Sequence, residues 1–110
     1  MDKITILNRI RNRICKGWTQ GSLARNDKRE EVTVFAPEAT MFCLVGAIRV
    51  ECLKEEEEDN EFDIEDELQI SLPGSWGREN LEKWNDFTLT TEEDVLSLID
   101  RTIERLRAEA

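Results

Sequence analysis

The segment that most restricts the fold spans residues 37–56 and reads PEATMFCLVGAIRVECLKEE. Pro37 suits the first position of a helix, and apolar residues then cover nearly the whole helical circumference, including Met41, Leu44, Val45, Ile48 and Cys52. A helix that is apolar all round belongs in the interior, and this one is too short and too charged to cross a membrane. Gly46 weakens such a helix by up to about 1 kcal/mol relative to alanine. We therefore expect a neighbouring helix or strand to approach its backbone there, with a closely bound ligand as the alternative.

Two further helices are predicted near the ends of the chain. Residues 4–15 carry apolar side chains three or four positions apart, and Gly17 marks the end of that helix. In the last helix, Thr90 and Thr91 each precede an acidic residue by three positions, a pattern typical of a helix N-terminus. The apolar stripe that follows consists of Val95, Leu96, Ile99, Ile103 and Leu106.

Shorter elements are expected between these helices. Residues 32–35 are β-branched and aromatic, which predicts a strand paired with residues 22–24. A short helix is predicted over residues 64–72, ended by Pro73-Gly74-Ser75, and another turn or two near Leu81 and Trp84. The expected fold is a single domain, residues 1–110, of mainly α (α+β) class: three to five helices around a buried central helix, with a short β-hairpin.

The absence of histidine excludes several kinds of site. It removes the usual base of Ser-His-Asp and Cys-His catalysis and every zinc site that needs imidazole. The three cysteines, Cys15, Cys43 and Cys52, form no CxxC pair, so we expect small buried apolar residues rather than a zinc site of thiolates and a carboxylate. General acid–base chemistry by carboxylates such as Asp27 or Asp86 stays open, but no motif fixes a catalytic pair. We therefore predict a protein that is not an enzyme and has no cofactor or metal.

The cellular compartment is predicted from the lack of a membrane-spanning segment and of a signal peptide in the sequence. No apolar run approaches the roughly 20 residues that span a membrane. The first residues also lack the continuous apolar stretch of a signal peptide. Together with the odd number of cysteines, these features predict a cytoplasmic protein.

Charge is distributed unevenly along the chain. The formal net charge is −10, yet residues 1–36 hold eight basic and four acidic residues and so carry +4. Either the fold has oppositely charged faces, or its two parts attract each other internally. Arg9, Arg13 and Lys16 lie off the apolar stripe of the first helix. A solvated face is the preferred interpretation of these three, because the rest of the chain would repel the phosphates of a nucleic acid.

The densest acidic run spans residues 55–67 and reads EEEEDNEFDIEDE. It opposes the dipole of the preceding helix, which is expected to fray near Glu56. Phe62, Ile64 and Leu68 predict that its second part is attached to the core. It fails as an EF-hand loop because Ile64 stands at the glycine position. Its candidate partner-binding residues are Glu55, Glu56, Glu57, Glu58, Asp59, Glu61, Asp63, Glu65, Asp66 and Glu67.

Three short motifs resemble an uncharacterised family of small proteins carried by bacteriophages and bacteria. They are Trp18-Thr19-Gln20-Gly21, Cys43-Leu44-Val45-Gly46-Ala47 and Trp84-Asn85-Asp86, which match W-x-Q-G, C-L-x-G-A and W-N-D. The resemblance runs from the first helix to the end of the chain and implies a phage or mobile-element context, without an established activity. The acidic run is longer and more acidic than the family pattern.

The favoured function is that of an inhibitor, encoded by a phage or a mobile element, that acts in the bacterial host. Its acidic surface would mimic nucleic acid and bind a basic surface of a host protein, such as a nuclease or a defence complex of the CRISPR type. We expect no direct contact with nucleic acid or membrane, and a homodimer is left open. Glu92, Glu93 and Asp94 are further candidates for this surface.

The alternative function is binding or sequestration of a small ligand such as a nucleotide signal. The candidate pocket for it comprises Trp18, Arg25, Trp84 and Asp86, with Arg29 as a further basic residue. We expect such motif residues to form turns and core contacts more often than they form a ligand pocket.

Overall fold

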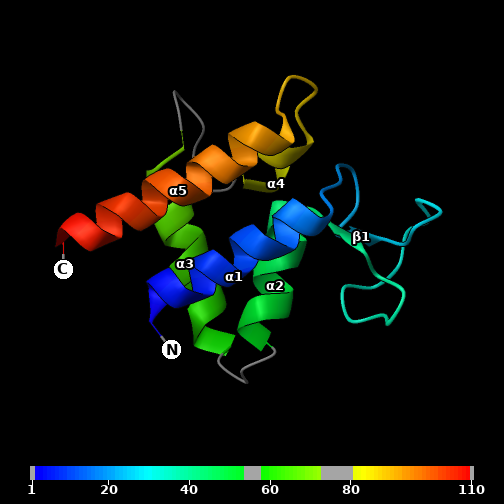
Figure 1. Ribbon diagram of the computed structural model, residues 1–110, viewed down its shortest axis with the longest axis horizontal. Helices are drawn as coiled ribbons and strands as arrows, with labels where there is room; N and C mark the ends of the chain where they lie inside the picture. The colour runs from blue at the N-terminus through cyan, green and yellow to red at the C-terminus, as the bar shows by residue number, and fades with distance from the viewer. Residues whose placement is uncertain (1, 54–57, 73–80, 110) are drawn as a thin grey trace.

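One short apolar helix is surrounded by other helices on several sides in the computed structural model (Figure 1). The structure describes residues 2–53, 58–72 and 81–109; for residues 58–62 it describes only the backbone. The helices are α1 (Lys3–Lys16), α2 (Leu44–Leu53), α3 (Glu58–Ile70), α4 (Leu81–Asp86) and α5 (Glu92–Glu109). The strands are β1 (Ala24–Arg25) and β2 (Met41–Phe42). The predicted mainly α (α+β) class, with a buried central helix and a small antiparallel pair of strands, is confirmed.

Helix α2 is the predicted central helix, and eight of its ten residues are buried. It packs against α1, α3, α4 and β2. The predicted close approach at Gly46 is confirmed, because a Cβ there would collide with the backbone carbonyl of Leu23. Residues 22–24 thus reach the backbone of α2, and the glycine makes room for them.

The predicted start of this helix at Pro37 is wrong. Residues 37 and 38 lie in a turn, and α2 begins at Leu44. The preceding residues pair as a strand on two sides instead: Phe42 N donates to Gly17 O over 2.9 Å, and Ala24 and Phe42 are partners in the β1–β2 ladder. These long-range backbone hydrogen bonds outweigh the helical periodicity of Met41 and Phe42.

The predicted strand over residues 32–35 is also wrong. Strand β1 pairs with β2, in the register Ala24 to Phe42 and Arg25 to Met41. Residues 32–35 lie outside both strands, although Val32 N donates to Ala24 O over 3.2 Å, and Phe35 is 58% exposed. The chain between the strands projects away from the helices (Figure 1).

The two long helices have well-formed ends. Asp2 caps α1 by accepting a hydrogen bond from Thr5 N at 2.8 Å. This bond lowers the pKa of the Asp2 carboxyl. At α5, Thr91 and Asp94 form the reciprocal capping box, with Thr91 N donating to Asp94 Oδ2 over 2.9 Å. Of the two predicted boxes, the one that begins at Thr91 is therefore formed.

Helix α3 begins at Glu58, earlier than the predicted residue 64, and ends at Ile70. Ile64 and Leu68 are fully buried, as the apolar positions in the acidic run predicted. Helix α4 confirms the turns predicted at Leu81 and Trp84. The expected fraying near Glu56 and the break at residues 73–75 lie outside the described residues. None of the described helices combines the length and the apolar character needed to span a membrane.

Candidate functional site

The three motif segments meet around one buried side chain, that of Asn85. Its Oδ1 accepts hydrogen bonds from Trp18 Nε1 at 2.8 Å and from Leu44 N at 3.0 Å. Its Nδ2 donates to Thr19 O at 3.2 Å and to Asp86 Oδ1 at 3.0 Å. Asn85 thereby joins the chain after α1, the start of α2 and the end of α4.

Gln20 and Gly21 extend this junction. Gln20 Nε2 donates to the carbonyl oxygens of Asn85 at 2.8 Å and Phe87 at 2.9 Å, and Gly21 N donates to Asp86 Oδ1 at 2.9 Å. Within the described residues, no buried side-chain nitrogen or oxygen lacks a hydrogen-bond partner. A network satisfied in this way holds the fold together and leaves no buried group for a ligand.

Among the described residues, the four members of the alternative ligand pocket lie in different surroundings. Trp18 and Arg25 line a cavity of about 470 Å³ together with Arg29, whereas the buried Trp84 lines a separate cavity of about 250 Å³. Asp86 serves the Asn85 junction. Arg25 is also engaged, because its guanidinium donates to Thr19 Oγ1 and to two backbone carbonyl oxygens.

The candidate partner-binding residues of the acidic run fall into three groups. Glu55, Glu56 and Glu57 lie outside the described residues. Glu58, Asp59 and Glu61 belong to the backbone of α3. Of the remaining four, Asp63 and Asp66 are exposed, and Glu65 and Glu67 are half-buried.

Glu67 ties α3 to two other helices. It accepts from Lys3 Nζ at 2.9 Å and from Arg105 Nη2 at 3.1 Å, which connects α3 to α1 and α5. The hydrogen bond from Lys3 is the main cause that lowers the pKa of the Glu67 carboxyl, with Arg105 acting in the same direction against partial burial. This carboxylate is therefore part of the framework rather than of a free acidic surface.

Similar ion pairs engage basic residues of α1. Arg11 pairs with Asp100 at 2.7 Å, and Arg13 pairs with Glu51 at 2.8 Å. Together with Lys3–Glu67, these contacts join α1 to α5, α2 and α3. Of the two interpretations of the uneven charge, attraction between the two parts of the fold is the one these contacts support.

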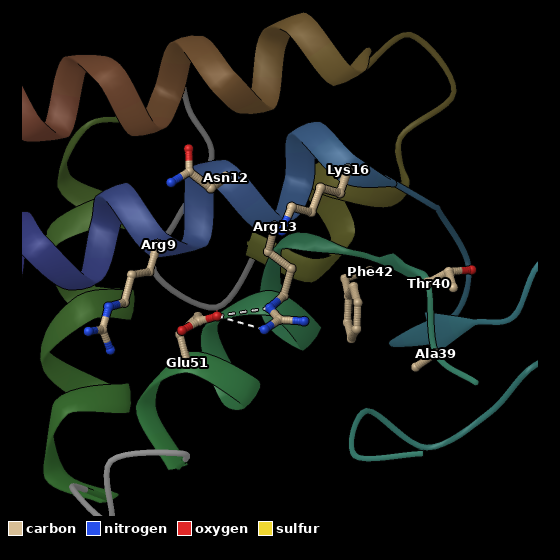
Figure 2. A pocket seen from close by; sticks show the side chains of 8 residues that line it. All are labelled: Arg9, Asn12, Arg13, Lys16, Ala39, Thr40, Phe42 and Glu51. Carbon is tan, nitrogen blue, oxygen red and sulfur yellow. Dashed lines mark hydrogen bonds and ion pairs between the residues drawn. The ribbon is translucent and has the colours of Figure 1, made fainter. Parts of the chain in front are cut away.

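A cavity of about 670 Å³ lies beside α1, where Arg9, Asn12, Arg13 and Lys16 share one face of the helix (Figure 2). Ala39, Thr40 and Phe42 and the α2 residue Glu51 line the rest. Sequence reasoning noted the three basic residues but not the cavity. The spacing of positions 9, 12, 13 and 16 was the available signal, since it places polar side chains on one helical face. Ala39, Thr40 and Phe42 were predicted to lie in the central helix, so their place in this lining was not predicted.

Arg13 and Glu51 form an ion pair in the lining of this cavity. Arg13 donates to Glu51 Oε1 through Nε at 3.0 Å and through Nη2 at 2.8 Å, and its guanidinium lies 4.9 Å from the centre of the Phe42 ring. Glu51 is only 5% exposed. The carboxylate and the ring therefore hold the guanidinium in one orientation.

The cysteines do not meet as a metal site. Cys43 and Cys52 are buried, as expected. The expected burial of Cys15 is wrong, because this residue is exposed near the end of α1. Burial raises the pKa of the Cys43 thiol to about 11. Among the described residues, no group of three or more acidic or cysteine side chains is arranged to hold a metal ion.

Comparison with known proteins gives a family and no activity. No curated protein and no solved structure matches the chain. A family of unknown function, DUF6197, matches residues 2–105, which is nearly the whole chain. The protein therefore belongs to the DUF6197 family.

Proposed function

We propose that the protein acts by binding, and that α3 presents its carboxylates to a basic, nucleic-acid-binding surface of another protein. Seven of the thirteen residues of α3 are acidic, and none is lysine or arginine. Such a helix attracts cationic surfaces over distances of about a Debye length, near 10 Å in moderate salt. The protein itself, at a net charge of −10, would be repelled by nucleic acid as a whole.

The observation that carries this proposal is that some residues of α3 anchor the helix to the core while others expose carboxylates. Ile64 and Leu68 are buried and anchor the helix, while Asp63 and Asp66 are exposed on it. Lys3 and Arg105 both form their ion pair with α3 at Glu67. The anchoring residues thus fix the exposed carboxylates on a rigid element, which reduces the entropy lost on binding.

The acidic first turn of α5 is a less suitable part of the same surface. Helix α5 meets α3 through Arg105, whereas Glu92, Glu93 and Asp94 lie at its other end. Twelve residues of helix separate Glu93 from Arg105, or roughly 18 Å along the axis. We therefore restrict the proposed surface to α3 and the adjoining acidic residues 55–57.

The proposed biological setting follows from the motif resemblance. A phage or mobile element would express the protein in a bacterial cytoplasm, where a nuclease or a defence complex of the CRISPR type offers a basic groove. Imitation of nucleic acid by carboxylates would block that groove. This setting makes such host proteins the first partners to test.

The experiment is a pull-down from bacterial lysate at low salt, followed by identification and purification of the captured protein. The double variant Asp63→Asn/Asp66→Asn should weaken binding of the purified partner at least about tenfold. The control is Glu31→Gln/Glu38→Gln, which removes the same charge from exposed positions between β1 and β2. Equal binding by both variants would contradict a role of α3.

A further inference from the structure

The cavity beside α1 has features that the acidic helix does not explain (Figure 2). Its volume of about 670 Å³ lies within the range of small-molecule sites, roughly 300–1,000 Å³. It faces α1, β2 and the end of α2 that holds Glu51. The question is which chemical class of ligand its walls would accept.

The cavity exists because the chain before α2 lies close against the end of α1. A Cβ at Gly17 would collide with the carbonyl of Thr40, so the glycine permits this approach. Phe42 N then donates to Gly17 O at 2.9 Å, and Thr40 N donates to Arg25 O at 2.9 Å. Backbone hydrogen bonds thus fix the wall that faces the basic side chains of α1.

The charge of the lining is opposite to that of the protein. Arg13 and Lys16 contribute two positive charges and Glu51 contributes one negative charge, and Arg9 also belongs to the lining. A cationic lining in a protein of net charge −10 favours an anionic ligand. A phosphate monoester, which carries about −1.5 to −2 at neutral pH, is such a ligand.

Three donors in the lining, on Arg13, Lys16 and Thr40, make no hydrogen bond to the residues that the structure describes. Arg13 uses Nε and Nη2 for Glu51, which leaves Nη1 without a hydrogen bond to the described residues. In Figure 2 this third nitrogen points away from Glu51. The ammonium of Lys16 and the hydroxyl of Thr40 also make no side-chain hydrogen bond within the described residues. These groups are therefore available to an anionic ligand.

The ion pair with Glu51 gives Arg13 a defined geometry. Burying two charges costs free energy, and a hydrophobic pair of similar volume often makes a protein equally stable. Stability alone therefore explains the Arg13–Glu51 ion pair poorly. Glu51 and the Phe42 ring orient the guanidinium before a ligand arrives. A donor fixed in this way binds an anion with a smaller entropy loss.

We propose that this cavity binds a small organic phosphate, with Arg13 Nη1 and Lys16 as the donors to the phosphate group. The cavity is larger than a bare phosphate ion requires, and Ala39, Phe42 and the aliphatic stem of Arg13 provide apolar surface for the organic part. This site is separate from the acidic helix, so the two proposals can fail independently.

The test is isothermal titration calorimetry of the full chain with AMP and with ribose 5-phosphate, using adenosine as the uncharged control. At least one of the two phosphates should bind, and adenosine should not. Lys16→Gln should weaken that binding about tenfold, the equivalent of one charge-assisted hydrogen bond at about 1.4 kcal/mol. Lys28→Gln, at an exposed lysine outside the cavity, is the matched control and should leave the affinity unchanged.

Arg13→Lys provides a second variant that keeps the charge beside Glu51 but removes the fork and Nη1. It should weaken phosphate binding at least as much as Lys16→Gln does. Thermal melting of each variant shows whether it is folded. The proposal is overturned if neither phosphate gives heat with the wild-type protein, or if a phosphate binds with equal affinity to Lys16→Gln and Lys28→Gln.

Discussion

Trp18 and Asn85 are joined by a hydrogen bond of 2.8 Å from the indole Nε1 to the amide Oδ1, across 67 positions of sequence. The same oxygen accepts from Leu44 N, so one side chain links three distant segments. The short motifs of this chain are thus explained by mutual hydrogen bonding in the interior. A motif that is structural in this way can be shared by proteins with different surfaces.

Replacing Asn85 by alanine should strongly destabilise the fold. The change leaves Trp18 Nε1 and Leu44 N without their acceptor in a site where Asn85 is 0% exposed. Each of the two unpaired donors costs about 1–3 kcal/mol, so the free energy of unfolding should fall by about 2–6 kcal/mol in urea titrations.

Two comparison variants make that result specific. Asn8→Ala removes only a local bond to Ile4 O at an exposed helix position, and it should change the stability by less than about 0.5 kcal/mol. Trp18→Phe removes one donor while Asn85 keeps Leu44, and should have a smaller effect than Asn85→Ala. Similar effects of Asn85→Ala and Asn8→Ala would show that the junction is unimportant.

Gly46→Ala distinguishes helix propensity from packing. By propensity alone, alanine should stabilise the middle of α2 by about 1 kcal/mol. The added Cβ would instead collide with the carbonyl of Leu23, a backbone group that cannot rotate away. We expect a net loss of about 1–3 kcal/mol in the free energy of unfolding. Ser97→Ala, at an exposed position of α5, is the control, and a stabilised Gly46→Ala protein would refute the close approach.

The ion pairs of Glu67 predict a dependence of stability on acid pH. The folded pKa of this carboxyl is lowered from its ordinary value of 4.5, chiefly by the hydrogen bond from Lys3. Its contribution is therefore fully present above pH 4.5 and is lost as the pH falls through the lower, folded pKa. Glu67→Gln should cost about 1–2 kcal/mol at neutral pH.

Urea titrations at a series of pH values measure this effect. The difference in unfolding free energy between wild type and Glu67→Gln should shrink steadily below pH 4.5, because the wild-type carboxyl becomes protonated. Asp66→Asn, at an exposed carboxylate of the same helix, should show a much smaller difference throughout. A difference between wild type and Glu67→Gln that does not vary with pH would contradict the assignment.

The thiols should differ in reactivity towards an alkylating reagent. Cys15 is exposed, whereas Cys43 and Cys52 are buried and burial raises the pKa of Cys43 to about 11. We expect one thiol to react rapidly in the native protein at pH 8 and three after denaturation, counted by mass spectrometry. Cys15→Ser should abolish the rapid phase, and a rapid phase that survives this change would show that a buried cysteine is accessible.

Periodicity predicted that the helices exist, but not where α2 and α3 begin. An apolar stripe is buried in any mainly helical fold, whereas the ends of a helix depend on its neighbours. Residues 4–15 correspond to α1, and the stripe from Val95 onward belongs to α5. The strands were mispredicted for a different reason. Pairing of Ala24 with Phe42 depends on close approaches at Gly17 and Gly46. The sequence predicted an approach at Gly46, but no local pattern showed which segment would make it.

The site was only partly predictable for the same physical reason. The sequence drew attention to the acidic run and the basic residues of the first helix. It could not show that Glu67 forms ion pairs with Lys3 and Arg105 from two other helices, or that Glu51 orients Arg13. Contacts of this kind depend on how helices pack, and the linear order of charges does not encode them.

The central claim, that α3 binds a basic partner surface, is tested most directly by the dissociation constant of the captured partner as a function of salt. The account predicts that raising the salt from about 50 mM to about 500 mM weakens binding by roughly tenfold or more, and that duplex DNA competes for the same surface. It also predicts a flatter salt dependence for Asp63→Asn/Asp66→Asn. Binding that is insensitive to salt and to duplex DNA would contradict the claim.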